Sequence, residues 1–189
     1  MYGKNVPDDF YEKIRPRLYR RIGRELGMAH RVLDVGCGNC DLVAFLRKAY
    51  RQRVTGVDVS GGKLPRRDHP SNSRAAMRCI KGDAARLAFL RDGSVDAVVT
   101  TWALHEMEDR PGGVAEAYRV LRPGGTMLIV DFPKGSLAQR LWNEDYLTVP
   151  QARMLLTDAG FVRVRARAIH KAQVIWAVGW RPPNAGGDT

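Results

Sequence analysis

The sequence predicts a doubly wound α/β fold, in which helices cover both faces of a mostly parallel sheet. An apolar run at 32–35, then Gly36 and Gly38, then helically spaced apolar residues at 42–46 indicate a buried strand, a tight turn and a helix. Similar short apolar runs recur along the chain, at 53–58, 75–81, 97–101 and 126–130. Such alternation with helical patterns is typical of parallel strands joined by helices.

The first half of the chain is expected to follow this alternation in order. A helix over 41–50 comes after the glycine turn, and the strand at 53–58 comes after that helix. The next stretch, 60–73, contains a glycine pair and two prolines, so we expect a loop in place of a helix. The strands at 75–81 and 97–101 complete this half.

The second half is expected to add a helix, a strand and a hairpin. A helix over 114–120 ends before Pro123 and the glycine pair that follows it. The later elements are a strand at 126–130, a linker at 136–146, a helix from Pro150 to Gly160, and two hairpin strands at 161–168 and 173–180. Residues 182–189 are expected to be a disordered tail.

Residues 1–181 are expected to form a single domain, of which residues 1–27 are an N-terminal helical cap. Apolar residues recur every four positions in this cap, at Phe10, Ile14, Leu18, Ile22 and Leu26. Pro16 should break or kink the helix near Arg15. The opposite side is a basic face, interpreted as solvated surface in preference to a binding patch, and consists of Arg17, Arg20, Arg21 and Arg24.

The composition favours a globular protein with a strong positive charge. The chain has 189 residues and 44% hydrophobic residues, which suits one domain with a substantial core. No apolar run is long enough to span a bilayer and the N-terminus lacks an apolar signal segment, so we expect a cytoplasmic protein. The net charge of +11 would attract nucleic acid, acidic substrates or anionic membranes, without choosing among them.

The three cysteines, Cys37, Cys40 and Cys79, are too few and too odd in number to predict a disulfide scaffold. Cys37 and Cys40 have the spacing of a metal or redox pair. No second cysteine pair or nearby histidine completes a zinc set, so no metal site is predicted.

The glycine turn is the first candidate binding site. Glycines at positions 36 and 38 let the backbone approach a ligand closely, because there is no Cβ in the way. The amides at the start of the next helix would face anionic or polar groups of that ligand. Asp58 ends the second predicted strand, where a carboxylate can accept hydrogen bonds from both hydroxyls of a ribose.

Five segments resemble, in order, the motifs of class I S-adenosylmethionine-dependent methyltransferases, in particular the small-molecule branch that includes the ubiquinone and menaquinone enzymes. They are Leu33-Asp-Val-Gly-Cys-Gly38, Gly56-Val-Asp-Val-Ser60, Gly82-Asp-Ala84, Asp96-Ala-Val-Val99 and Leu121-Arg-Pro-Gly-Gly125. The resemblance implies a Rossmann-like, seven-stranded mixed sheet with its last strand antiparallel. It departs at Cys40, where the family often has glycine.

The resemblance also implies S-adenosyl-L-methionine as cofactor and a set of residues around it. Asp34, Gly36, Cys37 and Gly38 would hold the methionine end, together with Thr100, Thr101 and Trp102. Asp58 would bind the ribose. Val59 would pack on the adenine, and the Gly82-Asp83-Ala84 segment would bind its amino group and a ring nitrogen. Tyr11 and Tyr19 of the N-terminal cap are candidates for the pocket lining, although packing alone also accounts for them.

His105 is the candidate catalytic residue. It follows the strand at 97–101, so it would face the substrate, and its ordinary pKa near neutrality suits a proton acceptor. Glu106 is the second candidate, and an enzyme that only positions its substrates is the alternative to both. The predicted activity is in-line methyl transfer to a small molecule.

Two other functions remain open from the sequence. A nucleic-acid (RNA) methyltransferase would explain the charge, but Thr101-Trp-Ala-Leu104 stands where an Asn-Pro-Pro-Tyr type motif would, and there is no appended RNA-binding module. The arginines are spread along the chain, so only weak, nonspecific nucleic-acid binding is predicted. The other alternative is a cofactor-binding protein without catalysis.

The segment at 60–73 and the N-terminal cap are predicted to form a mobile substrate entrance.

Overall fold

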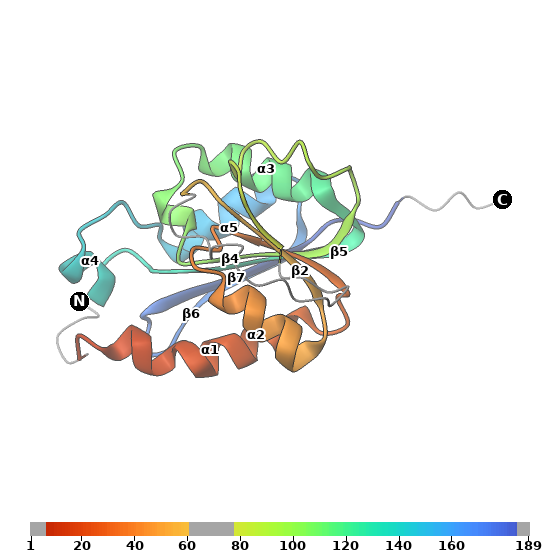
Figure 1. The fold of residues 1–189 in the computed structure, drawn as a ribbon. Coiled ribbons are helices and arrows are strands. Elements are labelled where there is room, and N and C mark those ends of the chain that lie inside the picture. Colours follow the sequence, from red (N-terminus) through yellow and green to blue (C-terminus); the bar gives the residue numbers. More distant parts are fainter. Residues whose placement is uncertain (1–6, 61–77, 185–189) are drawn as a thin grey trace.

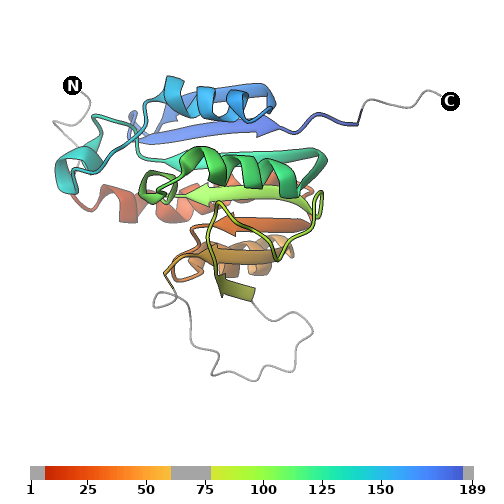
Figure 2. The same ribbon diagram turned by 90° about the horizontal axis from the view of Figure 1, so that it is seen from above.

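In the computed structural model, which describes residues 7–60 and 78–184, one sheet of seven strands carries helices on both faces (Figure 1). Its order is β3-β2-β1-β4-β5-β7-β6 (Figure 2). The strands are β1 (Arg31–Val35), β2 (Arg53–Asp58), β3 (Arg78–Lys81), β4 (Val95–Thr101), β5 (Leu121–Asp131), β6 (Val162–Ile169) and β7 (Val174–Trp180). Strands β1 to β5 pair in parallel, whereas β7 runs antiparallel to both β5 and β6. The predicted doubly wound sheet with an antiparallel last strand is confirmed.

The helices bury two separate apolar cores against the sheet. Helices α1 (Phe10–Leu26) and α2 (Asp41–Tyr50) cover one face, and α3 (Arg110–Val120) and α5 (Val149–Asp158) cover the other (Figure 1). A single-turn helix, η2 (Leu104–Glu106), follows β4, and the short α4 (Leu137–Leu141) follows β5. The strand order reverses between β1 and β4, so a crevice for a ligand is expected beyond their carboxyl ends.

Helix α1 is continuous, so a break at Pro16 is wrong, whereas the kink given as the other outcome stays a prediction. Pro16 lies on the exposed side of the helix, where water can solvate the carbonyl group that loses its hydrogen bond. On the opposite side, a buried stripe holds the helix against the sheet, and it consists of Tyr11, Ile14, Leu18, Ile22 and Leu26. Burial of this stripe outweighs the roughly 3 kcal/mol that an internal proline costs.

Several element boundaries differ from those predicted. Helix α3 begins at Arg110, because the Asp109 side chain accepts a hydrogen bond from the Gly112 amide and caps it. Strand β5 begins directly after α3, and its pairing with β4 shifts register between Val95 and Ala97. The expected linker at 136–146 contains α4. The predicted entrance segment 60–73 lies outside the described residues except for Ser60.

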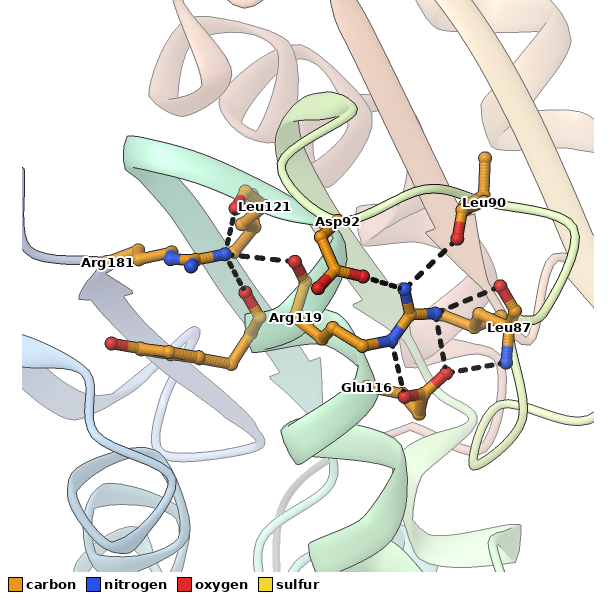
Figure 3. Close-up of polar contacts among 8 residues, drawn as sticks. Leu87, Leu90, Asp92, Glu116, Arg119, Leu121 and Arg181 are labelled. Atoms are coloured by element: carbon orange, nitrogen blue, oxygen red, sulfur yellow. Dashed lines mark hydrogen bonds and ion pairs between the residues drawn. The ribbon is translucent and has the colours of Figure 1, made fainter. Parts of the chain in front are cut away.

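A polar network fastens the loop after β3 to helix α3. The Arg119 guanidinium donates to the Glu116 and Asp92 carboxylates and to the carbonyls of Leu87 and Leu90 (Figure 3). The Arg181 guanidinium donates to the carbonyls at the end of α3. This network fixes the segment that follows Gly82-Asp83-Ala84.

None of the described helices has the length and apolar character to cross a membrane.

Candidate cofactor and acceptor site

The glycine turn after β1 has the left-handed backbone that its glycines allow. Gly36 has φ +73° and Gly38 has φ +51°. A Cβ at Gly36 would collide with Ala103, whereas at Gly38 it would meet nothing within 4 Å, because Gly38 faces a cavity. The Gly36 and Cys37 amides both donate to the Val57 carbonyl, which ties the turn to the end of β2.

Asp58 lies at the tip of β2 beside this turn, as predicted. Its carboxylate accepts hydrogen bonds from the amides of Gly38 (Oδ2, 2.8 Å) and Ser60 (Oδ1, 2.8 Å). Each carboxylate oxygen keeps a second lone pair for a further donor. The backbone therefore holds the acidic group in one orientation before any ligand arrives.

A cavity of about 230 Å³ opens between the turn, Asp58 and helix α1. Its lining includes Asp34, Gly36, Cys37, Gly38, Asp58, Thr101 and Trp102 from the predicted set, with Arg15, Tyr19, Asn39, Asp41, Leu42, Ala103 and Glu106 in addition. Trp102 has φ +55°, an uncommon value for a tryptophan, at the end of β4. The structure thus brings seven of the predicted cofactor residues together.

Two side chains in this cavity each have a buried polar atom without a hydrogen-bond partner among the described residues. Asp34 is fully buried, and its Oδ1 has no hydrogen-bond partner among the described residues. Its pKa is raised to about 7, mainly by burial and then by the charge of Asp58. The Nε of Arg15 is also buried without a hydrogen-bond partner among the described residues, and its guanidinium carbon lies 5.6 Å from the Trp102 ring centre. A buried carboxyl and a guanidinium that both have unsatisfied polar atoms suit a ligand that carries both a cation and a carboxylate, as the methionine part of S-adenosylmethionine does.

The remaining predicted cofactor residues do not line the described cavity. Asp83 accepts from the Ala85 amide, so its side chain caps a turn, and Val59 is 72% exposed. Thr100 is buried, and its hydroxyl lacks a partner among the described residues. The roles of these three residues, and of Gly82 and Ala84, in binding the cofactor stay predictions.

His105 lies on η2 beside Glu106, which lines the cavity, but His105 itself does not line it and is buried between carboxylates. Its Nδ1 is 2.7 Å from Asp131 Oδ1, and its Nε2 is 3.0 Å from Glu144 Oε2 and 4.0 Å from Glu106 Oε1. Burial alone would lower the pKa of His105, but the hydrogen bond and charge of Asp131, with Glu144 and Glu106, raise it above its ordinary value.

Asp131 is a site residue that the sequence did not reveal. It ends β5 and is almost fully buried, and its carboxylate also accepts from the backbone amides of His105 (3.0 Å) and Phe132 (2.7 Å). These bonds fix the carboxylate against the imidazole. Arg110 donates to the His105 carbonyl and to the Asp145 carboxylate, which fastens the loop before α5 to η2.

Aromatic side chains surround His105. Phe132 is their centre, with ring centroids 5.4 Å from Trp102, 4.6 Å from Tyr11 and 5.3 Å from Trp142. The Tyr146 ring is 4.8 Å from the imidazole. Two polar atoms of this group, Tyr146 Oη and Trp102 Nε1, are buried without partners among the described residues. An apolar wall with a few polar atoms is typical of a small-molecule site.

The three cysteines lie together, with sulfur atoms within 4.8 Å of one another. Cys40 forms a disulfide with Cys79, so the inference from the cysteine count was wrong about this pair, because the count does not show that the turn and β3 lie side by side. The Cys37 thiol lies 3.7 Å from Cys40 Sγ, and burial, followed by the charges of Asp34 and Asp58, raises its pKa to about 12. It is therefore protonated at neutral pH.

A second group with metal-ligand chemistry among the described residues is His105, Glu106 and Glu144, with ligand atoms also within 4.8 Å of one another. Its imidazole nitrogens already face Asp131 and Glu144, and the two glutamates are largely exposed. The cysteine group uses two of its sulfurs in the disulfide. One member of each group, Cys37 and Glu106, also lines the cofactor cavity.

The fold and the site together define a Rossmann-like domain with a nucleotide-type site at the switch point between β1 and β4. The methyltransferase domain family matches residues 33–129, which is just over half of the chain. The chain therefore belongs to this family, and the resemblance to class I S-adenosylmethionine-dependent methyltransferases is confirmed.

Individual relatives agree with this assignment. The demethylmenaquinone methyltransferase of Deinococcus radiodurans is 34% identical over 122 residues, which cover 62% of this chain and 50% of that protein. The 27-O-demethylrifamycin SV methyltransferase of Amycolatopsis mediterranei is 30% identical over 148 residues, with coverage of 70% and 53%. The chain thus spans about half the length of these curated relatives.

The fold is shared with solved structures at low sequence identity. A putative methyltransferase from Haloferax volcanii, solved with the Trm112 methyltransferase activator, has a TM-score of 0.74 and 18% identity, covering 94% of this chain and 95% of that one. At this identity the likeness concerns the fold alone.

Proposed function

We propose that this protein transfers the methyl group of S-adenosylmethionine to a small-molecule acceptor. The observation that carries the proposal is one cavity lined by Asp58, the buried Asp34 and Arg15, which also reaches Glu106, next to His105. Asp34 Oδ1 and Arg15 Nε lack hydrogen-bond partners among the described residues. Two relatives support a small-molecule acceptor, since their names refer to a menaquinone precursor and a rifamycin.

The cavity residues divide into groups that would hold different parts of the cofactor. Asp58 would accept the ribose hydroxyls, and the glycine turn would pass along the chain between ribose and methionine. Asp34 would accept from the ammonium group, and Arg15 would donate to the carboxylate. The remaining contacts are proposed for Thr100, Thr101 and Trp102 at the methionine and for Val59, Gly82, Asp83 and Ala84 at the adenine.

The chemistry supplied by S-adenosylmethionine is a methyl group already activated by a sulfonium. The protein then has to orient an acceptor and, for a hydroxyl, remove its proton. His105 is proposed as the general base, with Asp131 holding its Nδ1–H so that Nε2 faces the acceptor. Glu144 occupies that side of the imidazole in the structure, and its half-exposed side chain would give way to an acceptor hydroxyl.

The test begins with the ligands that purify with the protein. Mass spectrometry of the released small molecules should find S-adenosylmethionine or its demethylated product, and candidate acceptors are then assayed for methylated product. Tight cofactor binding with no turnover on any acceptor would favour a binding protein without catalysis. Absence of cofactor binding by calorimetry would refute the proposal.

A nucleic-acid acceptor is the second candidate, favoured by the net charge of +11. Incorporation of labelled methyl groups into RNA, compared with incorporation into small-molecule extracts, separates the two. Weak nonspecific binding to RNA without incorporation would leave the small-molecule proposal standing.

A further inference from the structure

Arginines from the two ends of the chain converge on one groove, which the sequence did not predict. Helix α1 packs on the sheet face to which β7 contributes Val174, Trp176 and Val178 (Figure 1), and Glu25 of α1 lies 4.0 Å from Arg165 of β6. Two cavities share Glu25 in their lining. One, of about 160 Å³, is lined by Glu25, Arg165, Ala166, Arg167, Trp176 and Val178. The other, of about 420 Å³, is lined by Arg21, Arg24 and Glu25. We call the two together the arginine groove.

Two of these arginines lie over tryptophan rings. The Arg21 guanidinium carbon lies 4.8 Å from the Trp176 ring centre, and that of Arg165 lies 4.9 Å from the Trp180 ring centre. Stacking fixes the plane of a guanidinium and leaves its N–H edges for other partners. In this position a planar guanidinium can donate two parallel hydrogen bonds to an anion such as a phosphate.

The groove offers almost only hydrogen-bond donors. Its four arginines carry no acceptor, and Glu25 is the single carboxylate in the lining of the two cavities. Trp176 is almost fully buried, lines the groove, and has an Nε1–H with no partner in the part of the chain that the structure describes. A ligand that satisfies this set must be an acceptor and must be negatively charged.

The positive field in the groove is not balanced by the protein. The pKa of Arg21 is lowered by burial and by the charges of Arg167 and Arg24, with Glu25 opposing. The pKa of His170, in the turn between β6 and β7, is lowered by burial and by Arg21 and Arg17. Like charges brought this close are unfavourable unless a partner supplies the opposite charge.

We propose that the arginine groove binds the phosphate backbone of single-stranded nucleic acid. The two adjoining cavities extend over more than one anion position, which suits a chain of phosphates better than one isolated phosphate. Proteins that bind a membrane surface usually insert exposed apolar side chains into it. Among the described residues, no large exposed hydrophobic side chain lines the groove, so the groove does not suit a membrane surface. The proposal does not depend on the methyl transfer proposed above.

The test measures binding of a short fluorescent single-stranded RNA by anisotropy over a range of salt concentrations. The variant R21Q/R165Q/R167Q removes three groove charges, and the variant K48Q/R91Q/R153Q removes three exposed charges elsewhere. For single strands each phosphate contact contributes about 0.7 to the slope of log K against log salt, so the groove variant should lower the slope by about 2. Its affinity at low salt should fall at least about tenfold. The control variant should stay close to the wild type.

Further measurements distinguish the proposal from its alternatives. Equal losses in the two variants would show attraction by diffuse charge alone. Binding to phosphatidylcholine–phosphatidylserine vesicles, with none to RNA, would indicate a membrane surface. Circular dichroism and cofactor calorimetry verify that each variant is folded. Because Arg21 packs on a buried tryptophan, R165Q/R167Q serves as a second groove variant, and RNA binding unchanged in both would overturn the proposal.

Discussion

The cofactor cavity and the aromatic cluster beside it are built in different ways. The cavity, called here the cofactor end, is made by backbone at the tips of β1 and β2, where the Gly38 amide and Asp58 are twenty positions apart. The aromatic cluster around His105 is the proposed acceptor end, and it shares only Trp102 with the cavity lining. It is made by side chains from four separate parts of the chain, Tyr11, Trp102, Phe132 and Tyr146. A turn and a strand tip form a site through local geometry, whereas the acceptor end exists only once the whole sheet is assembled. We therefore expect mutations at the two ends to separate binding from turnover.

The largest expected effect lies at the acceptor end. His105→Ala should lower kcat by about 100- to 10,000-fold, the usual contribution of a general base, and leave cofactor affinity unchanged. Product formation at saturating cofactor, with calorimetry of cofactor binding, measures both. The matched control is His30→Ala, since His30 is exposed and its hydrogen bonds to Asp96 and Arg53 use its backbone amide and carbonyl. A normal rate in His105→Ala would mean that positioning alone drives the reaction.

The cofactor end is further stabilised by the disulfide between the glycine turn and β3. It closes a sequence separation of 39 residues, for which the chain-entropy argument gives about 3–4 kcal/mol. Cys79→Ser should lower the free energy of unfolding by up to this amount in denaturant titrations without reductant. Adding reductant to the wild type should lower the free energy of unfolding by the same amount. Cys37→Ser, which leaves the disulfide intact, is the control. Equal stability of all forms would show that the bond does not form in solution.

Asp58→Ala tests the cofactor end directly. Loss of charge-assisted hydrogen bonds to the ribose should weaken S-adenosylmethionine binding by about 1.5–3 kcal/mol, or ten- to a hundredfold. Calorimetry measures the affinity, and kcat at saturating cofactor should change far less than in His105→Ala. Asp158→Ala on α5 is the exposed control. Unchanged affinity in a folded Asp58→Ala protein would remove this residue from the site.

The same contrast explains what could be predicted from the sequence. The glycine turn, the position of Asp58 at the tip of β2 and the pairing of β1 with β4 depend on short motifs and on the alternation of strands and helices, so the structure agrees with them. The antiparallel last strand was implied by the family resemblance and is confirmed. Arg15 and Asp131 were missed because each meets its site across a tertiary contact. Asp131 lies 26 positions from His105, and nothing local distinguishes it from other strand-end acids. The break at Pro16 was wrongly predicted because local propensity does not include the burial of the α1 stripe.

The smallest expected effect is a shift in pH dependence. His105 must be neutral to accept a proton, and Asp131, Glu144 and Glu106 raise its pKa against the effect of burial, so kcat should rise as pH increases through that raised value. Asp131→Asn keeps the shape of the side chain but removes the charge that contributes most to the raised pKa of His105. The midpoint of the rise of kcat with pH should therefore move to lower pH. The maximal rate should fall as well, because an amide can hold the wrong tautomer.

Two nearby groups need to be separated from His105 in this measurement. Asp34 has a pKa raised to about 7 by burial and Asp58, so its titration should affect cofactor binding, and kcat is therefore measured at saturating cofactor. Burial and the surrounding carboxylates raise the pKa of Tyr146 to about 12, outside the range of the profile. Glu108→Gln, at an exposed position between η2 and α3, is the control for a general change in charge. If the pH midpoint of kcat were the same in Asp131→Asn, Glu108→Gln and the wild type, Asp131 would not raise the pKa of His105. The acceptor end would then act by its shape alone.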